Sequence, residues 1–251
     1  MKRIIASIEA RMGSSRFPGK VLADVCGQPA LTRLVRRIRK CKKLDGIVLA
    51  TSIAPNDDVL EKWAVSENLD IYRGSEDDVL KRVVEAHIKM KSDIIVEITG
   101  DCILHDPEII DMGVETFLEN ECDVVTNVRK LSFPMGVDIQ VFQFDALKTV
   151  EKTVADESVR EHVSLYFYEH PEIYRIIHLF APARWYAPTY RFQLDYPEDH
   201  QFIQEVYSRL EPLYGDDFGV EEIMALIRNE PQLVDINHHC YEKLARPILP
   251  G

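Results

Sequence analysis

One short loop near the N-terminus, from Glu9 to Lys20, carries the residues that are best suited to chemistry. It reads EARMGSSRFPGK, so glycines and serines are interspersed with the three cations Arg11, Arg16 and Lys20. Glycines let a ligand approach the backbone closely, serine hydroxyls and amides donate hydrogen bonds, and the cations offset negative charge. A loop of this kind after a strand is typical of a polyphosphate-binding site.

The loop does not match the two commonest nucleotide-binding motifs. It lacks the GxxxxGK(S/T) pattern of P-loop enzymes and the GxGxxG pattern of dinucleotide-binding folds. From residue 11 to residue 43 the chain has ten Lys and Arg residues and one acid, Asp24, although the net charge of the whole protein is −12. We interpret the cations from Arg33 to Lys43 as a solvated helix face, and we expect the three cations of the loop to bind phosphate.

Length and composition indicate a globular protein with one large domain. The chain has 251 residues, of which 46% are hydrophobic and 29% are charged. No apolar run approaches the roughly 18 residues of a membrane span, and the negative charge disfavours a nucleic-acid partner. The five cysteines are scattered without a CxxC pair, so we expect buried or half-buried free thiols. The apolar run at residues 4–8 is too short for a signal peptide, and we expect a cytoplasmic protein.

Strands and helices are predicted to alternate over the first half of the chain. Continuous apolar runs predict buried strands, and apolar residues at helical spacing predict the helices between them. The strands are expected at residues 4–8, 46–51, 69–72, 93–98 and 122–126, and the helices at 31–41, 59–64, 79–87 and 107–118. This alternation predicts a mostly parallel sheet covered on both faces, with ligands beyond the carboxyl ends of its strands.

The pattern changes from about residue 131. Alternating polar and apolar residues at 137–142 predict a half-exposed or antiparallel strand. Helices at 158–168, 202–210 and 220–227 and short strands near 175–180 and 191–195 complete the prediction. No linker or repeat separates the two halves, so one α/β domain with a smaller lobe is the simplest architecture.

The loop also supports a family assignment. Its pattern Ala-Arg-x-x-Ser-x-Arg-x-Pro-Gly-Lys resembles that of the cytidylyltransferases that activate 3-deoxy-manno-octulosonate and sialic-type nonulosonic acids. The SpsF-like branch, which serves spore coat polysaccharide biosynthesis, is the most similar. The resemblance implies a Rossmann-like nucleotide-diphospho-sugar transferase fold, one domain over 1–251 and a homodimer. About 1–130 would bind the nucleotide, and about 131–251 would bind the sugar and form the dimer.

Two aspartates match metal ligands of the resembled family. Asp101 follows a Gly at the end of the predicted strand 93–98, and Asp195 begins the segment DYPED. The resemblance implies that both carboxylates hold Mg²⁺ against the phosphates of CTP, and oxygen ligands suit this cation. Alternatively, each aspartate only begins a helix, although Asp106 is a better cap for the helix after Asp101. Pro197 suits the first turn of the helix after Asp195, so Asp195 could bind the metal while this helix begins at Pro197.

Three further segments resemble parts of the family that contact substrates. The segment FPMGVDIQVF at 133–142 resembles one that lines the sugar-acid pocket, and Gln140 stands where the family often has Glu. As local structure we expect a β-turn there that opens an edge strand. Ser75 and Asp78 resemble a segment near the nucleotide, and Ser75 could cap the helix that follows. Glu161 and His162 resemble a pair near the sugar, although a lone histidine in a helix is more often structural.

The resulting hypothesis is transfer of CMP from CTP to an acidic sugar, with release of pyrophosphate, for cell-surface polysaccharide synthesis. Arg11, Lys20, Asp101 and Asp195 are the expected catalytic residues, and Asp195 would orient or deprotonate the attacking hydroxyl through the metal. The expected nucleotide-binding residues are Ala10, Arg11, Met12, Gly13, Ser14, Ser15, Arg16, Lys20, Ser75, Asp78, Thr99 and Gly100. The expected substrate-binding residues are Pro134, Gly136, Asp138, Gln140, Glu161 and His162.

Two other functions fit the same sequence. One is a nucleotidylyltransferase that acts on a sugar phosphate or a polyol phosphate, because the loop recognises a triphosphate more than an acceptor. Arg129, Lys130, Arg184 and Arg191 are candidate cations for either acceptor. The other is a non-catalytic nucleotide-binding protein on the same fold, and the presence of Lys20 with both aspartates argues against it.

Overall fold

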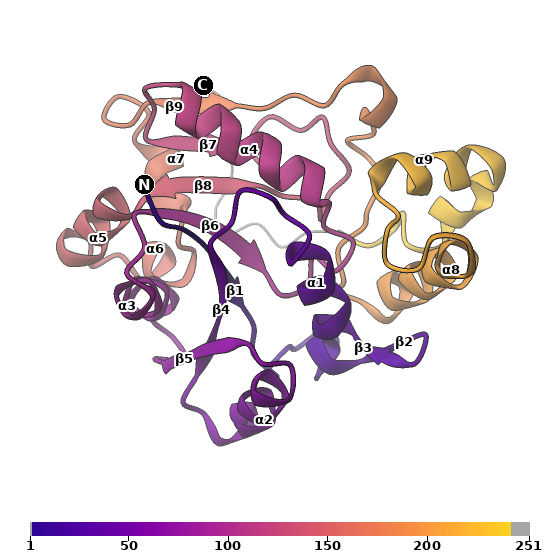
Figure 1. Ribbon diagram of the computed structural model, residues 1–251, viewed down its shortest axis with the longest axis horizontal. Helices are drawn as coiled ribbons and strands as arrows, with labels where there is room; N and C mark the ends of the chain where they lie inside the picture. Colours follow the sequence, from indigo (N-terminus) through magenta and orange to yellow (C-terminus); the bar gives the residue numbers. More distant parts are fainter. Residues whose placement is uncertain (1, 242–251) are drawn as a thin grey trace.

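The computed structural model describes residues 2–241 and has a seven-stranded sheet at its centre (Figure 1). In spatial order the strands are β5 (Asp70–Gly74), β4 (Gly46–Ser52), β1 (Ile4–Glu9), β6 (Ile94–Thr99), β8 (Gln140–Gln143), β7 (Val124–Thr126) and β9 (Ile176–His178). β8 runs antiparallel to both of its neighbours, β6 and β7, and the other pairings are parallel. The predicted mostly parallel sheet is therefore confirmed.

The central strands are apolar on both faces because each face is covered by a separate core. In β1, Ile4, Ala6 and Ile8 belong to one core cluster, and Ile5 belongs to the other. Successive side chains of a strand point to opposite faces, so a strand covered twice reads as a continuous apolar run. This is why the sequence pattern located β1, β4 and β6 well.

Helices cover both faces of the sheet. One core contains α1 (Ala30–Ile38), α2 (Asp58–Ser66), α4 (Pro107–Glu119), α8 (Pro197–Tyr214) and α9 (Val220–Asn229). The other contains α3 (Val79–Met90), α5 (Phe144–Thr153), α6 (Glu157–Glu161) and α7 (Leu165–Glu169). In Figure 1, α3, α5 and α6 lie to the left of the sheet, and α8 and α9 lie to its right. No helix of the described part of the chain is long and apolar enough to cross a membrane.

Short elements connect these layers. A two-stranded hairpin packs against α8, and four 3₁₀ turns lie in the connections. They are β2 (Asp24–Val25), β3 (Gln28–Pro29), η1 (Lys20–Leu22), η2 (Pro55–Asp57), η3 (Ala183–Trp185) and η4 (Pro231–Ile236). The sequence pattern predicted neither α5 nor the hairpin, whose strands of two residues are too short to show a period.

The prediction of a solvated cationic face on α1 is wrong for Arg33 and Arg37, which are 0% and 1% exposed. The Arg33 guanidinium lies 4.5 Å from the centre of the Tyr207 ring and pairs with Glu211. Nε of Arg37 donates to the carbonyl of His105 at 2.8 Å. Their partners come from α8 and from the turn before α4, so α1 uses two of its cations to join distant segments.

Four other expectations differ from the structure. Residues 191–195 form no strand, since only an isolated bridge joins Arg191 to Met135. The helix expected at 158–168 is broken at His162 into α6 and α7. The strand at 137–142 begins only at Gln140, and it is antiparallel as predicted but buried in the middle of the sheet rather than half-exposed. All five cysteines are free, and Cys26 is exposed, contrary to expectation.

Gly136 holds the turn before β8 against the segment that leads to Asp195. The amide of Met135 donates to the carbonyl of Tyr190 at 2.9 Å, and the amide of Phe192 donates to the carbonyl of Met135 at 2.7 Å. Gly136 has a φ of +98°, and a Cβ added there would lie 2.5 Å from the backbone nitrogen of Gln193. Both the backbone conformation and the close approach therefore require glycine.

We predict that Gly136→Ala lowers the free energy of unfolding by about 3 kcal/mol, because it combines a positive φ with a backbone overlap. Gly27→Ala is the matched control, since Gly27 has a φ of +80° but open space around its Cβ position. It should cost only about 1 kcal/mol. Urea unfolding of both variants measures the difference, and equal losses would contradict the proposed overlap.

Candidate functional site

The candidate site lies where β1 and β6 end side by side. These strands are parallel neighbours, with Glu9 paired to Thr99. The amide of Gly100 donates to the carbonyl of Glu9 at 2.8 Å, and a Cβ on Gly100 would lie 2.8 Å from Cβ of Ala10. The close contact of these two chain segments places Asp101 directly beside the loop that follows β1.

The loop after β1 is folded back on itself. The carbonyl of Met12 accepts from the amides of Ser14 and Gly19 at 3.0 and 3.1 Å. The amide of Met12 donates to Oδ1 of Asp57 at 2.7 Å, which ties the loop to the end of β4. Arg11 is exposed and lies near the buried Arg82. The loop thus has a defined shape before any phosphate contacts it.

A single ammonium group joins three distant parts of the chain. Nζ of Lys20 lies 2.6 Å from Oδ2 of Asp101 and 2.5 Å from Oδ1 of Asp195. All three side chains are largely buried. The structure therefore brings together three of the four predicted catalytic residues.

A second group of contacts fixes Asp195. Its Oδ2 lies 3.0 Å from Arg16 and 3.3 Å from Arg191. Arg191 also pairs with Asp199 at 2.8 Å, and the amide of Asp195 donates to the same Asp199 carboxylate at 2.9 Å. Asn237 completes the group, because its side chain donates to Asp199 at 2.9 Å. Asp195 is thus held at the start of α8 by a buried network.

The charges of Lys20 and Asp101 stabilise each other. Burial acts to raise the pKa of Asp101, but the Lys20 ammonium outweighs it and holds that pKa below its ordinary value. Burial also acts to lower the pKa of Lys20, and the two aspartates outweigh it, so this pKa lies above its ordinary value. Both groups are therefore ionised at neutral pH.

The two aspartates fit the predicted magnesium site. Mg²⁺ in enzymes that bind nucleotides is usually held by one or two carboxylates together with substrate phosphates. Asp101 and Asp195 direct one oxygen each at a single cation, the Lys20 ammonium. Among residues 2–241 no group of three or more His, Cys, Asp or Glu side chains could hold a metal, so the two aspartates would need substrate phosphates as further ligands. Magnesium itself remains a prediction.

The other predicted nucleotide contacts have local partners. Asp78 caps α3 by accepting from the amide of Lys81 at 3.0 Å, and it also pairs with Arg160. Ser75 accepts from the amide of Asp78 at 3.0 Å, so it supports the cap rather than forming it as we expected. Thr99 contacts the thiol of Cys102 at 3.1 Å. Their contacts with a nucleotide stay predictions.

The predicted substrate-binding residues lie in three places. Pro134, Gly136 and Asp138 lie in the turn that packs against residues 190–193. Gln140 begins β8 inside the sheet, where its side chain accepts from the Tyr168 hydroxyl at 2.6 Å. Glu161 and His162 end α6 at the break before α7. Of these residues, only Gln140 pairs with β6, opposite Glu97.

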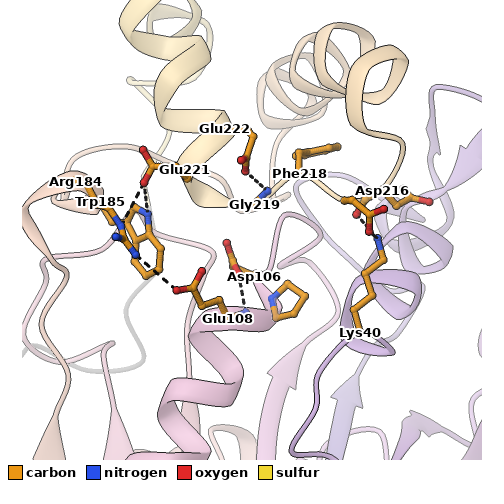
Figure 2. A pocket seen from close by; sticks show the side chains of 12 residues that line it. Lys40, Asp106, Glu108, Arg184, Trp185, Asp216, Phe218, Gly219, Glu221 and Glu222 are labelled. Atoms are coloured by element: carbon orange, nitrogen blue, oxygen red, sulfur yellow. Dashed lines mark hydrogen bonds and ion pairs between the residues drawn. The ribbon is translucent and has the colours of Figure 1, made fainter.

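A separate cleft of about 670 Å³ lies between the starts of α4 and α9 (Figure 2). Asp106 caps α4, as predicted, by accepting from the amide of Glu108 at 2.8 Å. The lining acids are Asp106, Glu108, Asp216, Asp217, Glu221 and Glu222. The cations Lys40 and Arg184 already pair with Asp217 and Glu221 at 2.5 and 3.3 Å. Such a lining repels a triphosphate, so the cleft is not the nucleotide site.

The comparison with known families decides the assignment. The sequence matches the model of the family described as Cytidylyltransferase over residues 5–235. The chain belongs to the cytidylyltransferase family. It is 34% identical over 238 residues to the spore coat polysaccharide biosynthesis protein SpsF of Bacillus subtilis. The aligned region covers 92% of this chain and 96% of that protein.

Solved structures agree with this membership. The structure of a cytidylyltransferase from Leptospira borgpetersenii superimposes with a TM-score of 0.87 at 27% identity, covering 93% of this chain and 97% of that one. A CMP:2-keto-3-deoxy-manno-octonic acid synthetase complexed with CTP has a TM-score of 0.61 at 15% identity, over 82% and 99% of the two chains, and shows the fold alone. The predicted family, enzyme class and fold are confirmed.

Several residues around the cytidylyltransferase site were missed by the sequence analysis. The Tyr196 ring lies under the Arg16 guanidinium, whose carbon is 5.2 Å from the ring centre. Asp199 was missed although its place in the first turn of α8 is typical of a capping box, and Asn237 was missed because it is distant from Asp195 in the sequence. Arg191, a candidate for the acceptor, pairs with both Asp195 and Asp199 instead. Arg184 lies in the acidic cleft.

We predict that Lys20→Met lowers the free energy of unfolding at pH 7 by about 3 kcal/mol, because two buried carboxylates lose a shared cation. Since the pKa of folded Asp101 is lowered, the stabilisation is present above its ordinary value of 3.8 and is lost as the pH falls through the folded-state value. The difference between the two proteins should therefore shrink in acid.

Lys43→Met is the matched control, because it removes an exposed ion pair with Glu115 at 2.8 Å. It should leave the free energy of unfolding unchanged, as exposed pairs contribute little. Urea unfolding between pH 3 and pH 7 measures both variants. A Lys20→Met protein as stable as the wild type would show that the shared ammonium does not stabilise the fold.

Proposed function

We propose that this cytidylyltransferase transfers CMP from CTP to an acidic sugar of the 3-deoxy-octulosonic or nonulosonic type and releases pyrophosphate. The convergence of Lys20, Asp101 and Asp195 beyond the carboxyl ends of β1 and β6 carries the proposal. Family membership supports the use of CTP. The name of the relative SpsF, in spore coat polysaccharide biosynthesis, supports a sugar as acceptor.

The catalytic contribution of the chain is positioning and charge stabilisation. The loop amides with Arg16 and Lys20 face the negative charge that builds up on the departing pyrophosphate. The acceptor hydroxyl oxygen attacks the α-phosphorus, and the bond from this phosphorus to the bridging oxygen breaks, so that pyrophosphate leaves with the electron pair. The hydroxyl proton passes to water, because the lowered pKa makes Asp101 a weak base and Asp195 is paired with Arg191 and would also hold Mg²⁺.

The Asp101 and Asp195 carboxylates would hold Mg²⁺, which when bound supplies positive charge to phosphate oxygens. Lys20 lies between the same two carboxylates. Its four-carbon stem is flexible, so its ammonium can turn from the carboxylates to a phosphate. The three cations of the loop, Arg11, Arg16 and Lys20, then bind the nucleotide rather than the acceptor.

The pairing of the acceptor cations favours a sugar acid over a sugar phosphate. A phosphate acceptor carries up to two negative charges and needs a strongly cationic pocket. Of the four candidate cations, Arg191 already pairs with Asp195 and Asp199, and Arg184 pairs with Glu221 in the acidic cleft. Arg129 and Lys130 lie together near His178. Two cations suit a single carboxylate better than a phosphate.

The first experiment is a pyrophosphate-release assay with Mg²⁺, each of the four nucleoside triphosphates, and a panel of sugar acids and sugar phosphates. We expect release with CTP and a 2-keto-3-deoxy sugar acid. Release with CTP and only a phosphorylated acceptor would replace the proposed acceptor with a sugar phosphate. Binding of CTP without release from any acceptor would contradict the proposed reaction.

Asp101→Asn should lower kcat about 100-fold or more, because it removes charge from the site but keeps its shape. The matched control is Asp70→Asn, the same chemical change at an exposed position where β5 begins. Steady-state kinetics over a range of Mg²⁺ concentrations measure both. Unchanged turnover and unchanged Mg²⁺ dependence in Asp101→Asn would remove Asp101 from the reaction.

A further inference from the structure

A row of polar side chains crosses the middle of the sheet, where a core would normally be apolar. The strand register pairs Ser7 with Glu97, Glu97 with Gln140, Gln140 with Thr126, and Thr126 with His178. We call these five residues the polar row. They lie in β1, β6, β8, β7 and β9, and paired residues of neighbouring strands share a face.

The next row on the same face is entirely apolar. It consists of Ile5, Ile95, Val124 and Ile176, each two residues before the polar row on its strand, and Phe142, two residues after it on the antiparallel β8. They belong to or pack against the core under α3, α5, α6 and α7. This face of the sheet therefore changes abruptly from apolar to polar toward the carboxyl ends of β1 and β6. Burying polar side chains in this way costs free energy unless a polar ligand binds to them.

Glu97 is the member of the row that most needs a partner. It is 5% exposed, its carboxyl group lies close enough to Glu9 for the two acids to share a hydrogen bond, and its Oε2 has no other partner in the described part of the chain. Burial first, and then the neighbouring Glu9, raise its pKa well above the ordinary value. Burial likewise raises the pKa of Glu9 to about 8. A neutral carboxyl group both donates and accepts a hydrogen bond, as a sugar hydroxyl does.

The other end of the row carries positive charge. The Tyr168 hydroxyl donates to Gln140 at 2.6 Å and lies 3.1 Å from the Thr126 hydroxyl. The Arg129 guanidinium lies over the same tyrosine ring, with its carbon 5.1 Å from the ring centre. β6 and β7 are two strand spacings apart, roughly 10 Å. One small molecule can therefore contact both the cationic end and Glu97.

We propose that the polar row binds the acceptor and that Glu97 selects it, with the acceptor carboxylate toward Arg129 and a sugar hydroxyl hydrogen-bonded to Glu97. This assignment rests on the proposed transfer of CMP to a sugar acid. It also explains why residue 140 is a glutamine. A glutamate at this position would place a third carboxyl group on the neighbouring strand, opposite Glu97. The neutral amide lets the acid pair of Glu9 and Glu97 stay buried.

The test compares KM for the acceptor with KM for CTP, using 3-deoxy-manno-octulosonate and a sialic-type nonulosonate as acceptors. We expect Glu97→Leu to raise the acceptor KM at least 10-fold and to leave the KM of CTP unchanged. Glu97→Gln keeps a donor and an acceptor, so its acceptor KM should stay within about threefold. Gln140→Glu should raise the acceptor KM, because it adds a buried carboxyl group beside Glu97.

A surface variant keeps the test independent of folding. Arg129→Met should raise the acceptor KM, whereas Lys148→Met should not, although Lys148 also lies over an aromatic ring, at 5.6 Å from Phe144. Wild-type turnover with an acceptor KM that neither Glu97→Leu nor Arg129→Met changes would overturn the polar row alone. No release from the wild type with any sugar acid, while CTP binds, would overturn the proposed function and the row with it.

Discussion

The site depends on one interaction, the sharing of the Lys20 ammonium by two carboxylates that are 81 and 175 residues away in the chain. Lys20 belongs to the loop after β1, Asp101 to the end of β6, and Asp195 to the start of α8. A buried charge is tolerated only when it is paired, so these segments must meet for any of the three side chains to be buried. The catalytic geometry and the closure of the fold are consequently the same set of contacts.

The second half of the chain supports this contact from outside the sheet. Arg191, Asp199 and Asn237 form a buried network whose function is to hold Asp195 in place. The turn at Gly136 is bonded to residues 190–193 and so connects β8 to the same network. The sheet therefore positions both the loop that we propose to bind the nucleotide, through β1, and the polar row, through β8. This arrangement lets one rigid element align a donor with an acceptor.

What the sequence could predict follows from how local each signal is. β1, β4 and β6 were found because a strand buried on both faces is apolar along its whole length. Asp106 was found because a cap and a proline lie next to each other. The burial of Arg33 could not be predicted, since its partner Glu211 is on α8, 178 residues away. The polar row was missed for the same reason: Glu97 and Gln140 become neighbours only through the register of an antiparallel strand placed between two parallel ones.

The position of β8 also constrains the order in which the chain can fold on the ribosome. β5, β4, β1 and β6 are complete by residue 99, but the neighbour of β6 is not synthesised until residue 140. During that interval β6 is an open edge on which another nascent chain could pair. Until β8 pairs with β6, Glu97 is open to water and ionised, and a charged residue on an edge strand is one way in which proteins discourage pairing with another chain. The residue that we assign to acceptor choice in the finished enzyme would thus also protect the unfinished sheet.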